Sequence, residues 1–202
     1  MAIDHKVRLV EELFDWLENE ISVFQSKTQL HCIAGCGKCC STPEINASPL
    51  EFLPWALHLF LNGEAEKMLD QLQQKSDSNC HLYRPLSFTD RNMGSCSDYR
   101  YRGLICRLFG YAASRDKYGQ LRLATCKIIK EGQQENYNTA EEAISKGLYV
   151  PVFTDYYMQL SQIDNRLGTS ILPINKALAT AIEEVLHYYA YRPLPNGLGD
   201  SA

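Results

Sequence analysis

The sequence predicts a mainly α fold, in which a single helical domain contains a cysteine-rich loop region and one short β-hairpin. Three observations carry this prediction. Apolar residues recur at helical spacing near both ends of the chain, all eight cysteines lie between residues 32 and 126, and one pair of β-like segments flanks a turn. Neither an internal repeat nor an alternation of strands with helices is visible in the sequence, which argues against a repeat protein or a parallel sheet.

The first element expected is a helix from Ile3 to about Gln29. Acidic residues lie off its apolar stripe, so the helix is amphipathic. It can dock on the core or pair with another chain as a coiled coil, and a repeat of only about three heptads favours docking. The stripe recurs in steps of four and three and consists of Ile3, Val7, Val10, Phe14, Leu17, Ile21 and Phe24.

Two further helices are expected after a cysteine and glycine loop over residues 31–43. Residues 48–51 read Ser-Pro-Leu-Glu, a capping box with proline at the first helical position, so a helix is expected to start there. Pro54 should delay or kink it. The next helix is expected after Asn62-Gly63, ending before Ser76.

Residues 79–103 show little regular period. Two short strands are expected over 104–113 and 121–129, joined across a turn at 115–119. A second capping box, Thr139 to Glu142, indicates another helix start.

The C-terminal part is again helical by its pattern. One helix is expected over 153–167, and the last one opens after Pro173. Pro193 and Pro195 should end that helix and leave a loose tail.

Composition excludes several classes of function. The 202-residue chain has a net charge of −4 and a pI of about 5.7, which predicts no nucleic-acid partner and no binding to anionic membranes. Its longest apolar stretch, 50–61, is too short to span a bilayer. The N-terminus lacks a signal-peptide pattern, so we expect a cytoplasmic protein.

The cysteines are the unusual feature of this composition. In a reducing cytosol, eight cysteines indicate metal binding or redox chemistry rather than disulfides. Thiolates select zinc, Cu(I) or iron–sulfur clusters. The candidate metal ligands are Cys32, Cys36, Cys39, Cys40, Cys80, Cys96, Cys106 and Cys126.

Their spacing leaves zinc and iron both open. Cys36-Gly-Lys-Cys39 is a Cys-x2-Cys pair, but a second such pair is missing, whereas structural zinc sites usually combine two. The clustering of the first four cysteines favours iron. Cys32-x3-Cys36-x2-Cys39 is also the spacing of radical-SAM enzymes, but a long helix precedes it here in place of the barrel strand of those enzymes.

Histidines and arginines also lie near the cysteines in the sequence. His31 and His81 each adjoin a cysteine, although eight thiols leave little need for histidine ligands. The segment 80–107 carries five arginines against two acids, which suits compensation of thiolate charge or an anion site. Arg107, directly after Cys106, is expected to lie near the sulfurs and favour their deprotonation.

These cysteine motifs resemble the YkgJ-type cysteine-cluster family, described as zinc- or iron-chelating and distantly related to flagellin lysine-N-methylase. The resemblance covers about residues 32–126 and uses all eight cysteines. It implies that they bind zinc or iron, with Gly103 and Gly110 departing from prolines usual in the family. The matching motifs are Cys32-x3-Cys36-x2-Cys39-Cys40, Cys80-His-Leu82, Cys96-Ser-Asp-Tyr99, Arg102 to Phe109 with Cys106-Arg-Leu-Phe109, and Cys126.

Together these observations predict a protein that binds iron, as an iron–sulfur cluster, or zinc, with a structural, sensory or electron-transfer role. Two alternatives stay open. One is a methyltransferase-like enzyme using a cluster with an open iron, and the other is an adaptor in which metal only staples the fold and the N-terminal helix binds a protein partner. The number of cysteine ligands separates the enzyme from the other roles, because four cysteines leave no coordination position on the metal open to a substrate.

The chain is accordingly divided into four regions of one domain. Residues 1–30 are the amphipathic N-terminal helix and 31–130 the cysteine-cluster metal-binding region. Residues 131–192 are C-terminal helices of the same domain, and 193–202 a flexible tail.

Overall fold

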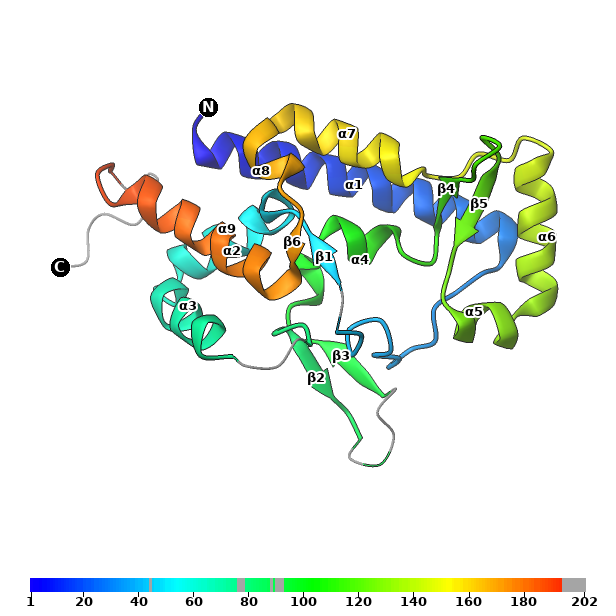
Figure 1. Ribbon diagram of the computed structural model, residues 1–202, viewed down its shortest axis with the longest axis horizontal. Coiled ribbons are helices and arrows are strands. Elements are labelled where there is room, and N and C mark those ends of the chain that lie inside the picture. The colour runs from blue at the N-terminus through cyan, green and yellow to red at the C-terminus, as the bar shows by residue number, and fades with distance from the viewer. Residues whose placement is uncertain (44, 76–78, 88, 90–92, 194–202) are drawn as a thin grey trace.

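The computed structural model describes residues 1–43, 45–75, 79–87, 89 and 93–193 (Figure 1). Helices dominate this described part, and its strands form antiparallel pairs, so the fold is mainly α with short hairpins, as predicted. The helices are α1 (Ile3–Thr28), η1 (Pro49–Phe52), α2 (Leu53–Leu61), α3 (Ala65–Gln74), η2 (Tyr99–Tyr101), α4 (Leu104–Leu108), α5 (Lys127–Gly132), α6 (Gln134–Ser145), α7 (Phe153–Ile163), α8 (Asn165–Thr169) and α9 (Ile174–Tyr189). The paired strands are β1 (Asn46–Ala47) with β6 (Leu172–Pro173), β2 (Tyr83–Pro85) with β3 (Gly94–Cys96), and β4 (Ala112–Arg115) with β5 (Leu121–Ala124).

The N-terminal helix α1 docks on the core along its predicted stripe. All seven stripe residues are buried, from Ile3 to Phe24. The helix packs against α2, α6 and α7, and α7 runs beside it in Figure 1. It ends where Gln29 adopts a left-handed conformation and donates its N–H to the carbonyl of Gln25 at 2.8 Å. The stripe therefore serves packing within this chain, as favoured over a coiled-coil seam.

The predicted start of the second helix is confirmed with one refinement. Glu51 makes its half of the capping box by accepting the N–H of Ser48 at 2.8 Å, whereas the Ser48 hydroxyl makes no bond within the described part of the chain, and the helix opened there is the short 3₁₀ turn η1. Pro54 then lies in the first turn of α2, where its missing N–H costs nothing. The following helix, α3, ends before Ser76 as expected, and α9 packs across both α2 and α3.

The first predicted strand, 104–113, is wrong in its first half. Residues 104–108 form α4, and only Ala112–Arg115 is a strand. Leu104 and Leu108 are both fully buried, so their spacing is the i, i+4 repeat of a helix face rather than strand alternation. The second predicted strand likewise ends at Ala124 and gives way to α5.

Two helix boundaries also differ from expectation. Thr139 lies inside α6, and its hydroxyl donates to the carbonyl of Glu135 at 2.9 Å instead of capping a helix. The helix predicted over 153–167 breaks at Asp164 into α7 and α8. Asp164 caps α8 by accepting the N–H of Leu167 at 2.9 Å and also binds Lys6 of α1.

The last helix, α9, starts and ends as predicted, with its expected apolar side buried. The predicted tail, apart from residue 193, lies outside the described residues. Among the described helices, none combines the length and the apolar character needed to cross a bilayer.

Two apolar clusters make up the interior. The main core joins α1, η1, α2, α3, α4, α7, α8 and α9. The small core lies between the end of α1, the β4–β5 pair and α5–α6, and consists of Phe24, Leu30, Ala113, Leu123, Ile129, Ala140, Ile144 and Val150. In Figure 1 the loop that follows α1 runs between the β2–β3 pair and α5.

Candidate metal centre

Tight turns fold the first cysteine segment, residues 32–40, back on itself. The N–H of Cys36 binds the carbonyl of Ile33 at 3.1 Å, and the N–H of Ser41 binds that of Gly37 at 3.0 Å. Gly35 between them has a φ of +74°, a conformation that few other residues adopt readily. The segment is therefore a compact loop that can present several sulfurs from neighbouring positions.

This loop packs on the β2–β3 pair by direct backbone approach. The N–H of Gly94 binds the carbonyl of Gly35 at 2.9 Å, and Cys36 forms an antiparallel bridge with Met93. A Cβ on Gly37 would lie 2.8 Å from the Cα of Gly94, so only glycine permits this contact. The approach brings the loop to the strand that ends at Cys96.

Cys80 and Cys96 are placed by the same pair of strands. Cys96 lies opposite Tyr83 in the register, and the N–H of Tyr83 binds the carbonyl of Cys80 at 3.1 Å. Asn175, at the start of α9, holds the Cys80 segment from the other side: it accepts the N–H of His81 at 2.7 Å and donates to the carbonyl of Asn79 at 2.8 Å.

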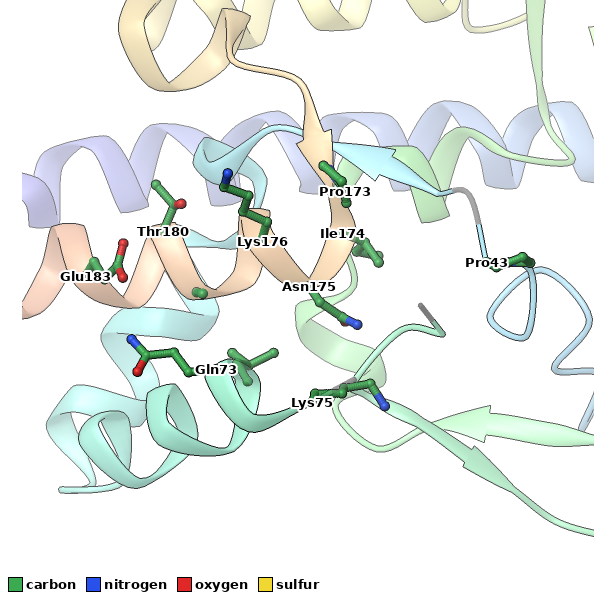
Figure 2. Close-up of a pocket in the computed structure, with 11 residues that line it drawn as sticks. Pro43, Gln73, Lys75, Pro173, Ile174, Asn175, Lys176, Thr180 and Glu183 are labelled. Carbon is green, nitrogen blue, oxygen red and sulfur yellow. The ribbon is translucent and has the colours of Figure 1, made fainter. Parts of the chain in front are cut away.

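Asn175 also lines a cavity of about 420 Å³ between α3 and α9 (Figure 2). Pro43, just beyond the cysteine loop, lines the same cavity, so the end of that loop and the start of α9 border one hollow. Polar side chains such as Gln73 and Thr180 contribute to its wall.

Cys106 is held by a buried carboxylate. Glu51 is fully buried, and its Oε2 accepts the N–H of Ile105 at 2.9 Å. Its Oε1 accepts the N–H of Ser48 at 2.8 Å and the hydroxyl of Tyr157 at 3.0 Å. Glu51 thus ties α4, which carries Cys106, to η1 and α7.

Cys32, at the start of the loop, and Cys126 lie next to the small core, away from the β2–β3 pair. The N–H of Cys32 binds the hydroxyl of Tyr111 at 2.7 Å. Gln133 makes two bonds to the backbone of His31, at 3.0 and 2.6 Å, which fix the loop to the end of α5. The sulfur of Cys126 accepts the N–H of Ile129 at 3.4 Å and so caps α5.

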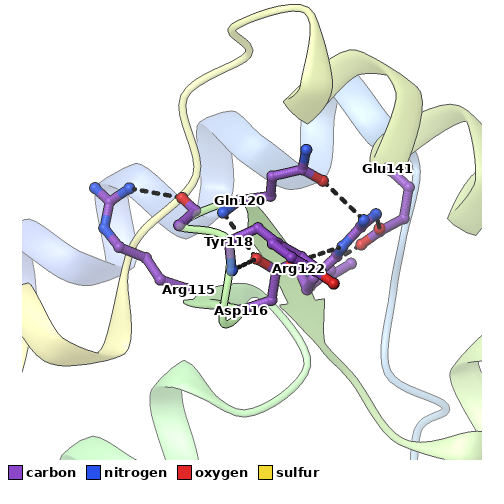
Figure 3. A network of polar contacts seen from close by, with 8 residues as sticks. Arg115, Asp116, Tyr118, Gln120, Arg122 and Glu141 are labelled. Atoms are coloured by element: carbon purple, nitrogen blue, oxygen red, sulfur yellow. Dashed lines mark hydrogen bonds and ion pairs between the residues drawn. The ribbon is translucent and has the colours of Figure 1, made fainter.

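A polar network braces the hairpin that leads to Cys126 (Figure 3). Oδ1 of Asp116 accepts the N–H groups of Tyr118 at 2.8 Å and Gln120 at 3.0 Å, which fixes the turn. Oδ2 pairs with Arg122 at 3.3 Å, and Arg122 also pairs with Glu141 of α6. The turn, β5 and α6 are thereby joined just before the last cysteine.

The thiols influence one another's ionisation. Burial first, then negative charge on Cys36, Cys39 and Cys126, raises the pKa of Cys32 to about 11. The sulfurs of Cys39 and Cys40 lie 4.0 Å apart, and the hydrogen bond between them lowers the pKa of Cys39 while raising that of Cys40.

The other buried thiols follow the same rule. Burial raises the pKa of Cys80 to about 11, with charge on Cys96 adding to the effect. Burial, followed by charge on Cys80, raises the pKa of Cys106 well above its usual range. Most of these groups are therefore protonated at neutral pH in the metal-free chain, and a metal that binds them must displace protons.

All eight predicted ligands are thus linked to another of the set by charge or by contact, although they come from five separate segments. Within the described residues, no three His, Cys, Asp or Glu side chains converge closely enough to hold a metal ion. The donor set nevertheless suits zinc or iron, because thiolates are the ligands that these soft centres prefer.

More than one arginine places positive charge beside the sulfurs. Burial raises the pKa of Cys96, and the charges of Arg102 and Arg84 act against that rise. Charge on Cys106 acts on Arg107, whose guanidinium binds Glu18 of α1 and the carbonyls of Arg102 at 3.0 Å and of residue 100 at 2.6 Å. Arg107 therefore joins α4 to α1, and its expected effect on thiol deprotonation stays a prediction. A further arginine of this segment, at position 91, lies outside the described residues.

Replacing Arg107 with methionine should lower the free energy of unfolding by roughly 2–4 kcal/mol, because Glu18 and two part-buried carbonyls lose their partner. Urea denaturation of the metal-loaded protein measures this effect. Arg8→Met is the control, since Arg8 contacts Glu12 and His5 on the exposed surface. Equal midpoints for the two variants would contradict the role given to Arg107.

Sequence reasoning found the cysteines but not the residues that place them. Asn175 and Gln133 each lie far along the chain from the backbone that they bind, so nothing local marks them. Of these three residues, only Glu51 is marked by a local sequence motif, as the last member of the capping box. Its second role at Ile105 depends on the fold.

Comparison with known proteins agrees with this geometry. Residues 31–142 match the family CxxCxxCC, described as "Putative zinc- or iron-chelating domain". The matched range contains all eight cysteines and ends within α6. Searches of curated proteins and of solved structures gave no match. Since the family match covers more than half of the 202 residues, the chain belongs to the CxxCxxCC family.

Proposed function

We propose that this protein binds iron or zinc through the thiolates of its eight cysteines. The observation that carries the proposal is the gathering of thiols from five chain segments, each segment held in place by its own hydrogen bonds. Several of these thiols have a raised pKa because of burial and of charge on other thiols, so they are costly for the metal-free chain to ionise, and a metal ion compensates their charge. The alternative use of eight cysteines, as disulfides, is not adopted, because all eight are free.

An iron–sulfur cluster is the form of the proposal that we favour. Cys36-Gly-Lys-Cys39 is a single Cys-x2-Cys pair, and the other cysteines arrive singly from the fold, whereas zinc knuckles usually come in pairs. Such a cluster supplies one-electron transfer when it is bound. The residues of this chain would ligate it, shield it with the main core and place Arg102 and Arg84 beside Cys96.

Anaerobic purification followed by iron, zinc and acid-labile sulfide analysis tests the proposal. We expect stoichiometric metal, and, for the favoured form, equal iron and sulfide with a brown visible spectrum. Zinc without sulfide would refute the cluster and keep the metal site. A protein that neither retains metal nor takes it up on reconstitution would refute the whole proposal.

Metal and folding should be linked. The ligands come from loops and element ends, so the site does not exist in the unfolded chain and metal binding stabilises the fold. Removing the metal with a chelator should lower the melting temperature by about 6–12 °C, which corresponds to about 3 kcal/mol for a chain of this size. Calorimetry of the loaded, stripped and reloaded protein measures the change. Identical melting of the loaded and stripped forms would contradict the linkage.

A further inference from the structure

The two apolar clusters divide the cysteines between them. Cys80 is part of the main core, and Cys96 and Cys106 pack against its edge. Cys126 packs instead against the small core. The four thiols outside the loop are therefore anchored to two different apolar clusters in the metal-free chain.

The hydrogen bonds of the loop follow the same division. At its start, Cys32 is fixed to Tyr111, and Gln133 at the end of α5 holds the preceding residue, so this end belongs with Cys126. Further along, Gly35 and Gly37 pack on Gly94, next to the strand of Cys96. The loop therefore spans the gap between the two units, with sulfurs available to both.

Mutual charge effects sort the thiols in the same way. Cys32 is influenced by Cys36, Cys39 and Cys126. Cys40 is influenced by its neighbour Cys39 and then by Cys106 and Cys80.

On the second side, charge on Cys80 and Cys96 acts on Cys106, and charge on Cys96 acts on Cys80. Charge on Cys126 acts on Cys32, a thiol of the first side.

The boundary falls between Cys39 and Cys40. Their sulfurs are 4.0 Å apart, and Cys39 acts on thiols of both sides. Cys39 forms a Cys-x2-Cys pair with Cys36, the spacing that lets both residues bind one metal. Cys40 is then left for the side of Cys80 and Cys106.

We infer that the chain holds two adjacent centres of four thiolates each, one from Cys32, Cys36, Cys39 and Cys126 and the other from Cys40, Cys80, Cys96 and Cys106. The inference rests on the proposed function. Each centre takes a thiophilic metal, either a single zinc ion or one iron–sulfur cluster. Four protein ligands fill each centre, so neither has a position open to substrate, which separates this arrangement from an enzyme with an open iron.

Titration of the metal-free full-length chain with Co²⁺ counts the centres. Thiolate-to-cobalt absorption should rise linearly to two equivalents and then stop. In the Cys126→Ser and Cys106→Ser variants, the tetrahedral four-thiolate spectrum should fall by about half in each, and Cys39→Ser should behave like the first while Cys40→Ser behaves like the second. A break at one equivalent, or loss of the whole signal in either single variant, would overturn the division.

Cadmium NMR on the wild-type chain gives the same answer without any variant that could misfold. Two cadmium resonances are expected, each correlated with the side-chain protons of four cysteines and sharing none. One resonance, or a cysteine correlated with both metals, would overturn the inference while leaving the proposed metal binding intact. Failure of the chain to bind Co²⁺ or Cd²⁺ at all would refute both.

Discussion

Replacing Gly37 with alanine is expected to disrupt metal binding without removing any ligand. The new Cβ would lie 2.8 Å from the Cα and 3.0 Å from the nitrogen of Gly94. Both are backbone atoms of β3, so neither can turn aside as a flexible side chain would. The ring of Tyr83, 2.5 Å from the same Cβ, closes the remaining side.

The cysteine loop must therefore move away from β3 in this variant. The bond from Gly94 to the carbonyl of Gly35 and the bridge between Cys36 and Met93 are lost or stretched. We expect a loss of about 1–3 kcal/mol in the free energy of unfolding from overpacking. Metal affinity should fall about tenfold or more, the scale seen when residues behind the ligands are changed.

Competition with a chromophoric chelator measures the affinity, and urea denaturation measures the stability. Gly132→Ala is the matched control, because a Cβ at Gly132 would meet no atom within 4 Å. If Gly37→Ala bound metal as tightly as Gly132→Ala, the close packing of the loop on β3 would have no part in forming the site.

The long helices could be predicted because one apolar face decides them. In α1 and α9 the buried residues follow a helical period over many turns. The sequence pattern alone therefore predicts which face of each helix packs on the core. In α4, five residues are too few for a period to show, so the sequence pattern predicts a strand there instead. Its helical form depends on contacts of Leu104 and Leu108 with the main core.

The same contrast applies to the candidate site. Thiol chemistry and spacing single out the cysteines locally, so the sequence predicts them. The sequence does not predict the β2–β3 pair, because its strands are three residues long and contain Gly94, which has no strand preference. The ion pair of Arg107 with Glu18 is equally unpredictable, because Glu18 lies on α1, far along the chain.

The second large effect expected is a pH dependence of stability caused by Glu51. Burial raises the pKa of this carboxyl from 4.5 to about 7, although the N–H groups of Ser48 and Ile105 and the hydroxyl of Tyr157 act in the opposite direction. The charge of Glu51 in turn raises the pKa of Cys106. The folded chain therefore holds a proton at position 51 more tightly than the unfolded chain does.

The sign of the pH effect follows from this difference. Because the folded-state pKa is the higher one, the stabilisation is fully present below about pH 4.5 and is lost as the pH rises through about 7. Between about pH 5 and pH 8 the wild-type chain should lose roughly 2–3 kcal/mol through this group alone. Glu51→Gln cannot titrate and should lack that loss.

The quantity to measure is the difference in unfolding free energy between wild type and Glu51→Gln at each pH, because effects of other groups cancel in it. The variant should be less stable than wild type at low pH, since its amide NH₂ faces a backbone N–H donor where a carboxyl oxygen stood. The gap should narrow by roughly 2–3 kcal/mol as the pH rises to about 8. Glu66→Gln, at an exposed position on α3, is the control for removing a carboxyl outside the core. A gap for Glu51→Gln that does not change with pH would mean that Glu51 keeps its charge throughout, held by its three donors against the cost of burial.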